Sequence, residues 1–306
     1  MKKVAVLLSS YNGERFIKEQ IDSILNQKGI EAYLFVRDDG SKDSTIKIIN
    51  DYKATNDKVN LIEGENENVG NSFMDLLYST PDNFDYYAFS DQDDIWQLDK
   101  LEKAIEFIEQ KNIMLYTSNQ ECVDANGQSL GLRYTKEEYI HLAPIEILFL
   151  NKVSGCTMVM TNELYKILTV KEHRPSRELL HNRIHDVWVA MVASIYNSIG
   201  YDERAFIKYR QHGGNVVGAY RPSLAKRIKS RIHNLFNKEL QQGRSRLARE
   251  ICDRFGKDVQ IDEEIIRCEA KKGKDKMYLI KHASQLVKYT GESKIGFICK
   301  VVLGLF

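Results

Sequence analysis

The first half of the chain alternates short apolar runs with amphipathic segments, and this alternation constrains the fold more than any other feature. Val4–Leu8 is a continuous apolar run, as expected for a strand that is buried on both faces of a sheet. Residues 16–25 follow with apolar side chains at helical spacing. The same alternation predicts strands at 32–36, 58–63, 86–89 and 113–117, and helices at 44–52, around 73–77 and around 101–108.

This order of elements implies an α/β fold with a Rossmann-like, mainly parallel sheet and helices on both faces. Ligands of such sheets bind beyond the carboxyl ends of the strands. Two acidic clusters, residues 38–39 and 91–94, directly follow predicted strands. Because both clusters fall at such ends, a ligand-binding site explains them better than acidic residues scattered over the surface.

The composition changes near Gly218, so we predict a catalytic domain at 1–217 and a helical C-terminal region at 218–306. The second region opens with a basic amphipathic helix. Its basic character and the apolar stretch 295–306 fit peripheral contact with an anionic membrane surface. The alternative is a helical appendage on the catalytic domain or a homo-oligomer contact. The apolar positions of the basic helix are Leu224, Ile228, Ile232 and Phe236.

Bulk composition excludes several classes of protein. Lys and Arg total 44 and Asp and Glu total 43, so the net charge of +1 argues against a nucleic-acid binder. The five cysteines form no C-x-x-C pair, which disfavours a zinc site or a disulfide framework. The apolar start is too short for a signal peptide, and no stretch has the length of a transmembrane helix. We therefore expect a cytoplasmic protein, with a peripheral position at the inner face of the plasma membrane as the membrane-bound alternative.

The acidic cluster Asp91-Gln92-Asp93-Asp94 is the main candidate for chemistry. The chain has neither a glycine-rich dinucleotide turn after its first strand nor a P-loop, so any bound nucleotide has to be held through a metal. Carboxylates this close repel one another unless a cation lies among them. Mn²⁺ or Mg²⁺ suits carboxylate oxygens and shares its coordination with phosphates. The alternative is an acidic helix start that is stabilised by the helix dipole.

Three further residues are candidates, each with a simpler alternative. Asp39 has the chemistry to accept a hydrogen bond from a base or a ribose hydroxyl, although an Asp-Gly turn explains its position equally well. Asp186, near the start of a helix predicted at 185–196, is a candidate general base, or a charge at a helix N-terminus. His212 lies beside glycines in a loop and is a candidate metal or phosphate ligand, or a surface histidine.

Together these motifs resemble the inverting glycosyltransferases of family 2, which have the GT-A fold. The resemblance covers roughly residues 3–217 and rests on motifs in the order that the family has them. The motifs are Val6-Leu7-Leu8-Ser9-Ser10-Tyr11-Asn12-Gly13, Arg37-Asp38-Asp39-Gly40-Ser41, Asn68-Val69-Gly70 and Ser90-Asp91-Gln92-Asp93-Asp94-Ile95-Trp96.

The resemblance implies a role for each matched residue. Asp186 would be the catalytic base, although this chain has His185 where many members have Glu. The metal would be held by Asp93 and His212. The acceptor side would include Asp94, Trp96 and His185. The nucleotide-sugar site would comprise Ser9, Tyr11 near the base, Glu14, Asp39 at the base or ribose, Asn68 and Gly70 near the diphosphate, Asp91 at the ribose and Arg210 at a phosphate.

Three segments, residues 37–41, 91–96 and Tyr209-Arg210-Gln211-His212-Gly213, are similar to those of bacterial rhamnosyltransferases of surface-polysaccharide synthesis. This implies transfer of L-rhamnose from dTDP-β-L-rhamnose to a hydroxyl of a growing cell-surface polysaccharide or lipid-linked glycan, with Mn²⁺ or Mg²⁺. One alternative is another donor, a UDP-hexose or UDP-HexNAc. A second is a sugar-nucleotide-binding assembly protein without catalysis. A sugar nucleotidyltransferase is disfavoured, because Ser9-Ser10 stands where its glycine-rich phosphate loop would begin.

Overall fold

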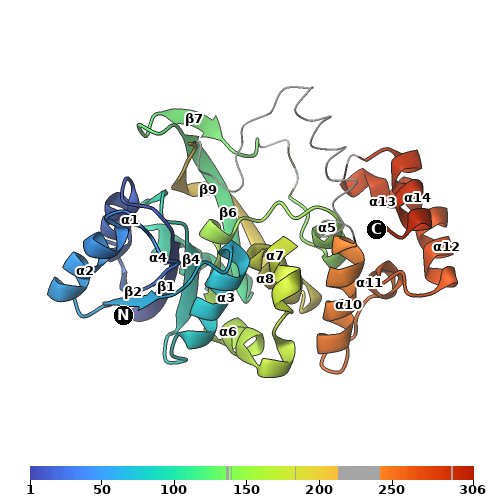
Figure 1. Ribbon diagram of the computed structural model, residues 1–306, viewed down its shortest axis with the longest axis horizontal. Coiled ribbons are helices and arrows are strands. Elements are labelled where there is room, and N and C mark those ends of the chain that lie inside the picture. The colour runs from blue at the N-terminus through green and yellow to red at the C-terminus, as the bar shows by residue number, and fades with distance from the viewer. Residues whose placement is uncertain (136–137, 139, 183, 213–241, 291) are drawn as a thin grey trace. The chain divides into compact units, whose positions relative to one another are not determined.

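The computed structural model describes all residues except 136–137, 139, 183, 213–241 and 291, and it divides into two compact units that we describe one at a time (Figure 1). The predicted boundary near Gly218 and the predicted basic helix at 224–236 lie outside the described residues. The helix that carries Asp186 groups with the C-terminal helices, although the sequence predicted it in the first domain. The first unit is Met1–Ile140, Val153–Val170 and Ser198–Tyr220, and the second is His141–Lys152, Lys171–Asn197 and Arg221–Phe306.

The first unit is built on one mixed sheet with the strand order β3-β2-β1-β4-β8-β6-β9-β5, with β7 paired to β6. Strands β1 to β4 are parallel, so the predicted parallel half is confirmed. Strand β8 is antiparallel to both of its neighbours, while β9 is parallel to β6. The strands are β1 (Lys2–Ser10), β2 (Ile30–Asp38), β3 (Val59–Glu63), β4 (Tyr86–Ser90), β5 (Ile95–Trp96), β6 (Leu115–Val123), β7 (Ser129–Leu132), β8 (Val159–Thr161) and β9 (Ile199–Arg210).

Helices cover both faces of this sheet. Strand β1 is apolar at every position from Val4 to Leu8, so both of its faces are buried under helices. On one face Val4, Val6 and Leu8 share a buried cluster with apolar side chains of α1 and α4. Alternate residues of a strand point to opposite faces, and on the other face α3 packs against β1. The helices of this unit are α1 (Ile17–Leu25), α2 (Thr45–Thr55), α3 (Val69–Ser79), α4 (Lys100–Lys111) and α6 (Asn162–Thr169).

The register of the sheet brings the predicted site residues to one edge. Ser10 at the end of β1 pairs with Asp38 at the end of β2, and Leu8 pairs with Ser90, directly before Asp91. Strand β9 ends at Arg210, opposite Val123 at the end of β6. The acidic turns after β2 and β4 and the end of β9 therefore meet at the carboxyl edge, as expected for this fold.

The second unit is helical in the part of the chain that the structure describes. Helix α8 is its most buried element, since every residue from Val187 to Ile195 is less than a tenth exposed. No helix of the described residues is both long and apolar enough to cross a membrane. The helices are α5 (Pro144–Phe149), α7 (Arg177–Asn182), α8 (His185–Ile195), α10 (Gly243–Phe255), α11 (Glu263–Cys268), α12 (Gly273–Lys281), α13 (Ala283–Leu286) and α14 (Lys294–Leu303).

The central position of β1 gives a stability prediction. Leu7 is 0% exposed and lies between Phe35 and Phe89 in the sheet register. Leu7→Ala should lower the free energy of unfolding by about 2–5 kcal/mol, because it removes buried apolar volume and leaves a cavity. The matched control Leu130→Ala, at a side chain that is 62% exposed, should change it by less than about 0.5 kcal/mol. Denaturant titration measures both, and equal losses would contradict this account of the core.

Candidate donor and metal site

The acidic turn after β4 is held by the end of β9. His212 Nε2 lies 2.6 Å from Asp93 Oδ2, and these residues are 119 positions apart in the chain. Both side chains are mostly buried, with 20% and 14% exposure. The His212 ring also packs on Phe16, at 5.0 Å between ring centroids. The structure thus joins the two residues that the sequence predicted as metal ligands.

Arg210 fixes the backbone around this pair. Its guanidinium donates to the carbonyl oxygens of Asp93 and Ala125, each at 3.0 Å, and to Glu19 Oε2 at 2.6 Å. Its backbone N–H donates to Asp94 Oδ1 at 3.2 Å. The side chain is only 4% exposed. The guanidinium therefore binds the protein at the acidic turn, where the sequence predicted a phosphate contact.

Asp91 and Asp94 form the inner part of the turn together with Cys156. One ligand atom from each of these three residues lies within 4.8 Å of the others, a spacing that suits a cation. Asp94 is 0% exposed, and burial with the charges of Asp93 and Asp91 raises its carboxyl pKa well above the usual value. Burial, followed by the charge of Asp93, also raises the pKa of Asp91. Both shifts favour the neutral carboxyl, and the crowding that contributes to them is of the kind that a cation among the carboxylates relieves.

Lys100 is a buried amine near this turn that sequence reasoning missed. It is 0% exposed, and its Nζ lies 3.5 Å from the centre of the Trp96 ring. Its Nζ has no hydrogen-bond partner among the described residues. Burial lowers its pKa to about 7, opposed by the nearby Cys156 and Asp94. As the first residue of a helix it carries no sequence signal that separates it from a surface lysine.

The loop after β1 is tied to the acidic turn by Gln92. Its side-chain amide accepts from the Tyr11 N–H and donates to the Tyr11 carbonyl, both at 3.0 Å. A Cβ on Gly13 would lie 2.1 Å from Gln92 Oε1, so only glycine fits there without a shift. The Tyr11 side chain remains 46% exposed. This arrangement leaves the Tyr11 ring available for a planar ligand beside the turn.

The other predicted nucleotide contacts are held by protein groups. The Glu14 carboxylate accepts from the Ser44 N–H at 2.9 Å, at the start of α2. Asp39 is 5% exposed, pairs with Arg37 Nε at 3.1 Å and accepts from the Ser72 hydroxyl. Burial raises its pKa, against the effects of Ser72 and Arg37. These contacts position the acidic turn after β2 and leave less of each carboxylate for a ligand.

The remaining predicted donor-side residues lie at ends of elements. Asn68 caps α3, with its side chain accepting from the Asn71 N–H at 3.2 Å and its backbone at φ 68°. Gly70 is buried in the first turn of α3, and Ser9 is half-buried near the end of β1. Through Ser72, α3 contacts Asp39. The loop that the sequence predicted to support a diphosphate therefore adjoins the acidic turn after β2.

The residues predicted on the acceptor side are all buried. Asp94, Trp96 and His185 are 0%, 2% and 3% exposed. Burial lowers the pKa of His185 to about 3, so this imidazole is neutral near pH 7. Such burial favours a structural role for these side chains over direct contact with an acceptor.

Asp186, the predicted base, lies in the first turn of α8 in the second unit and is partly exposed. Its Oδ1 accepts from the Val187 N–H at 2.6 Å. A carboxylate at a helix N-terminus is stabilised in its charged form, which is the form that a general base needs.

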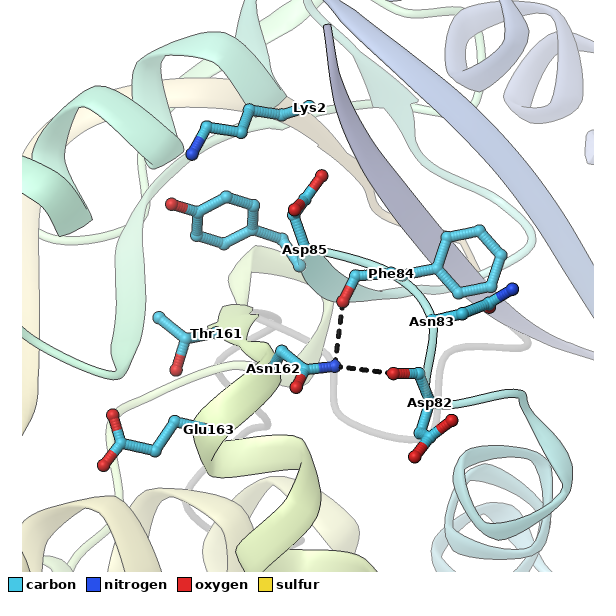
Figure 2. A pocket seen from close by; sticks show the side chains of 9 residues that line it. Lys2, Asp82, Asn83, Phe84, Asp85, Thr161, Asn162 and Glu163 are labelled. Carbon is cyan, nitrogen blue, oxygen red and sulfur yellow. Dashed lines mark hydrogen bonds between the residues drawn. The ribbon is translucent and has the colours of Figure 1, made fainter.

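A cavity of about 400 Å³ lies elsewhere in the first unit, where β1 and β4 begin (Figure 2). Asn162 Nδ2 donates to the carbonyl oxygens of Asp82 and Phe84 at 3.0 and 2.9 Å there. Lys2 at its rim pairs with Glu109 at 3.1 Å. The cavity contains none of the predicted site residues, so it gives no support to a donor site at that edge.

Solved structures have the same fold. S. aureus TarS 1–349 in complex with UDP-GlcNAc is 18% identical, with a TM-score of 0.59 over 98% of this chain and 81% of that chain. Mannosyltransferase PcManGT from Pyrobaculum calidifontis, in complex with GDP-Man and Mn²⁺, is 14% identical, with a TM-score of 0.51 over 100% and 81%. At these identities the likeness establishes the fold alone, which is that of GT-A glycosyltransferases.

Fold and sequence together define the class, a nucleotide-sugar glycosyltransferase. A family profile described as "Glycosyl transferase family 2" matches residues 5–160, more than half of the chain. The chain therefore belongs to glycosyl transferase family 2, which confirms the resemblance drawn from its motifs.

The chain is also similar in sequence to two curated bacterial glycosyltransferases. The dTDP-rhamnosyl transferase RfbG of Shigella flexneri is 29% identical over 220 residues, 69% of this chain and 74% of that protein. The putative teichuronic acid biosynthesis glycosyltransferase TuaG of Bacillus subtilis is 28% identical over 161 residues, 51% of this chain and 61% of that protein.

The contacts of Arg210 generate a prediction. Lysine cannot reproduce a fork that reaches two carbonyl oxygens and a carboxylate, so Arg210→Lys should weaken Mn²⁺ and nucleotide-sugar binding by about tenfold or more. Arg204→Lys, on the same strand with a side chain that is 59% exposed, is the matched control and should bind as the wild type does. Calorimetric titration measures both. Equal affinities of the two variants would remove Arg210 from the site.

Proposed function

We propose that this glycosyltransferase is metal-dependent and inverting, and that it transfers L-rhamnose from dTDP-β-L-rhamnose to a hydroxyl of a cell-surface polysaccharide or a lipid-linked glycan. The observation that carries the proposal is the contact of Asp93 with His212 at 2.6 Å, at the carboxyl edge of the sheet. A carboxylate and an imidazole that meet at a buried turn form a donor set for a divalent cation.

Asp93 and His212 would hold Mn²⁺ or Mg²⁺, and the donor set fits. A single oxygen and a single nitrogen already face each other, and Arg210 fixes the carbonyl of Asp93 from behind. Supports of this kind orient metal ligands. When bound, the cation would supply positive charge that stabilises the departing diphosphate.

The nucleotide end of the donor would be held by the loops after β1 and β2. The exposed Tyr11 ring is suited to stack on the base. Asp39 offers a carboxylate oxygen to the base or the ribose, and Asp91 offers one to a ribose hydroxyl. Because Gln92 ties the Tyr11 backbone to the acidic turn, base and metal ends of the donor would be bound by one connected structure.

Asp186 would act as the general base. It would remove the proton from the acceptor hydroxyl as that oxygen attacks the anomeric carbon on the face opposite the diphosphate. The bond to the diphosphate breaks as the new glycosidic bond forms, so a single displacement inverts the centre. A dTDP-β-L-rhamnose donor would then give an α-L-rhamnoside.

The rhamnosyl donor is favoured by similarity to RfbG, whose name specifies a dTDP-rhamnosyl transferase. UDP-GlcNAc and GDP-Man, bound in the two structural relatives, are the competing donors. A thermal-shift panel of the three nucleotide sugars with Mn²⁺ separates them, because a ligand at a hundred times its Kd stabilises the folded state by about 2.7 kcal/mol. Selective stabilisation by dTDP-rhamnose is expected. Stabilisation by another donor alone would replace rhamnose in the proposal.

The base assignment has its own test. Asp186→Asn should lower kcat by about a hundredfold or more, because the amide cannot accept the hydroxyl proton, while Mn²⁺ and donor still bind. Glu178→Gln, at a carboxylate of the same unit whose side chain is 75% exposed, is the matched control and should keep wild-type turnover. Single-turnover transfer with saturating donor measures both. Near wild-type transfer by Asp186→Asn would exclude Asp186 as the base.

A further inference from the structure

Helix α14 of the second unit is apolar on two opposite faces. Phe297 and Val301 are 0% exposed and pack inward. On the other face a row of apolar side chains repeats at positions i, i+4, i+7 and i+8, the spacing of one helical stripe. A helix that is apolar all round is normally covered on all sides. The members of this exposed stripe are Ile295 at 76% exposure, the exposed Cys299, Val302 at 60% and Leu303 at 69%.

Helix α12 lies against α14 and extends the same kind of surface. Near the end of α14, Lys276 Nζ lies 3.9 Å from the position that a Cβ on Gly304 would occupy. Met277, the next residue of α12, is 65% exposed. Lys274 and Lys281, three residues before it and four after, share its helical face and are exposed. Exposed apolar side chains are therefore combined with lysines on two helices in contact.

The charge of this segment is strongly one-sided. Residues 271–306 contain eight lysines and only two acidic residues. Asp275 pairs with Arg267 at 3.0 Å, and Glu292 pairs with Arg244 at 2.7 Å and with Lys300 at 3.1 Å. Both carboxylates are thus neutralised locally. Lys271 pairs with Glu269 and Asp253 outside the segment, so the lysines other than Lys271 and Lys300 give the segment its positive potential.

From this combination we propose that the α12–α14 face, formed by the stripe on α14 with Met277 and the lysines of α12, docks on an anionic membrane surface. Aliphatic side chains would enter the boundary of headgroups and acyl chains, and the lysines would extend to acidic headgroups. A second copy of the chain fits less well, because two such segments would bring like charges together. The inference concerns where the enzyme works and does not depend on which sugar it transfers.

Flotation of the full chain with phosphatidylcholine vesicles, with and without phosphatidylglycerol, tests the proposal. Binding is expected only to the vesicles that contain phosphatidylglycerol, and it should weaken as salt is raised, because salt screens the lysines. No binding, or equal binding to both kinds of vesicle, would overturn the proposal.

Two sets of variants locate the surface. Ile295→Gln/Val302→Gln/Leu303→Gln should abolish flotation, whereas Leu130→Gln/Leu132→Gln, at exposed leucines of β7 in the first unit, should float as the wild type does. Lys274→Gln/Lys281→Gln should weaken partitioning by about twentyfold, since each lysine near an anionic surface contributes about fivefold.

These variants change exposed side chains, so donor binding with Mn²⁺ should be unchanged in all of them and serves as the check on folding. Flotation of the α14 triple variant at the wild-type level would overturn the proposal. So would a dimer, seen by sedimentation, that this triple variant dissociates, since it would assign the stripe to self-association.

Discussion

Repulsion among the carboxylates of Asp91, Asp93 and Asp94 is the constraint on which the site depends. The turn after β4 gathers the three where burial and mutual charge raise the pKa of Asp91 and Asp94. Protein groups compensate from several directions. The backbone N–H of Arg210 donates to Asp94, and its guanidinium donates to the carbonyl of Asp93. The buried amine of Lys100 lies over the Trp96 ring and interacts electrostatically with Asp94.

The end of β9 supplies these compensating groups to the acidic turn of the first unit. The strand runs parallel to β6 and ends at the carboxyl edge, where Arg210 and His212 reach the acidic turn. The turn after β4 alone would supply only like charges. The end of β9 adds an imidazole and a guanidinium, so the acidic turn gains a paired carboxylate and imidazole together with a fixed support.

Much of the fold could be predicted from the sequence, because its signals are local. The apolar run Val4–Leu8 and the helical spacing of residues 16–25 each identify an element without knowledge of its neighbours. The acidic turns follow from where these elements end. No periodic pattern connects Asp93 with His212, which are 119 positions apart. Only the order of the family's motifs predicted that the two residues act together.

The parts that the sequence did not reveal depend on tertiary contacts. Lys100 looks like a surface lysine at a helix start, yet it is fully buried. Arg210 looked like a phosphate ligand, yet its guanidinium binds two carbonyl oxygens and Glu19. Glu14 is similar, because its carboxylate accepts from the start of α2. The partners of Arg210 and Glu14 lie far away in the chain, where spacing carries no information.

Pulsed electron spin resonance of Mn²⁺ bound with a nucleoside diphosphate shows whether Asp93 and His212 together bind the cation. If they do, the wild type has a hyperfine coupling from an imidazole nitrogen, which His212→Gln abolishes. A Mn²⁺ spectrum without nitrogen coupling in the wild type, or one that His212→Gln leaves unchanged, would contradict this assignment and move the cation to other ligands, such as the group of Asp91, Asp94 and Cys156.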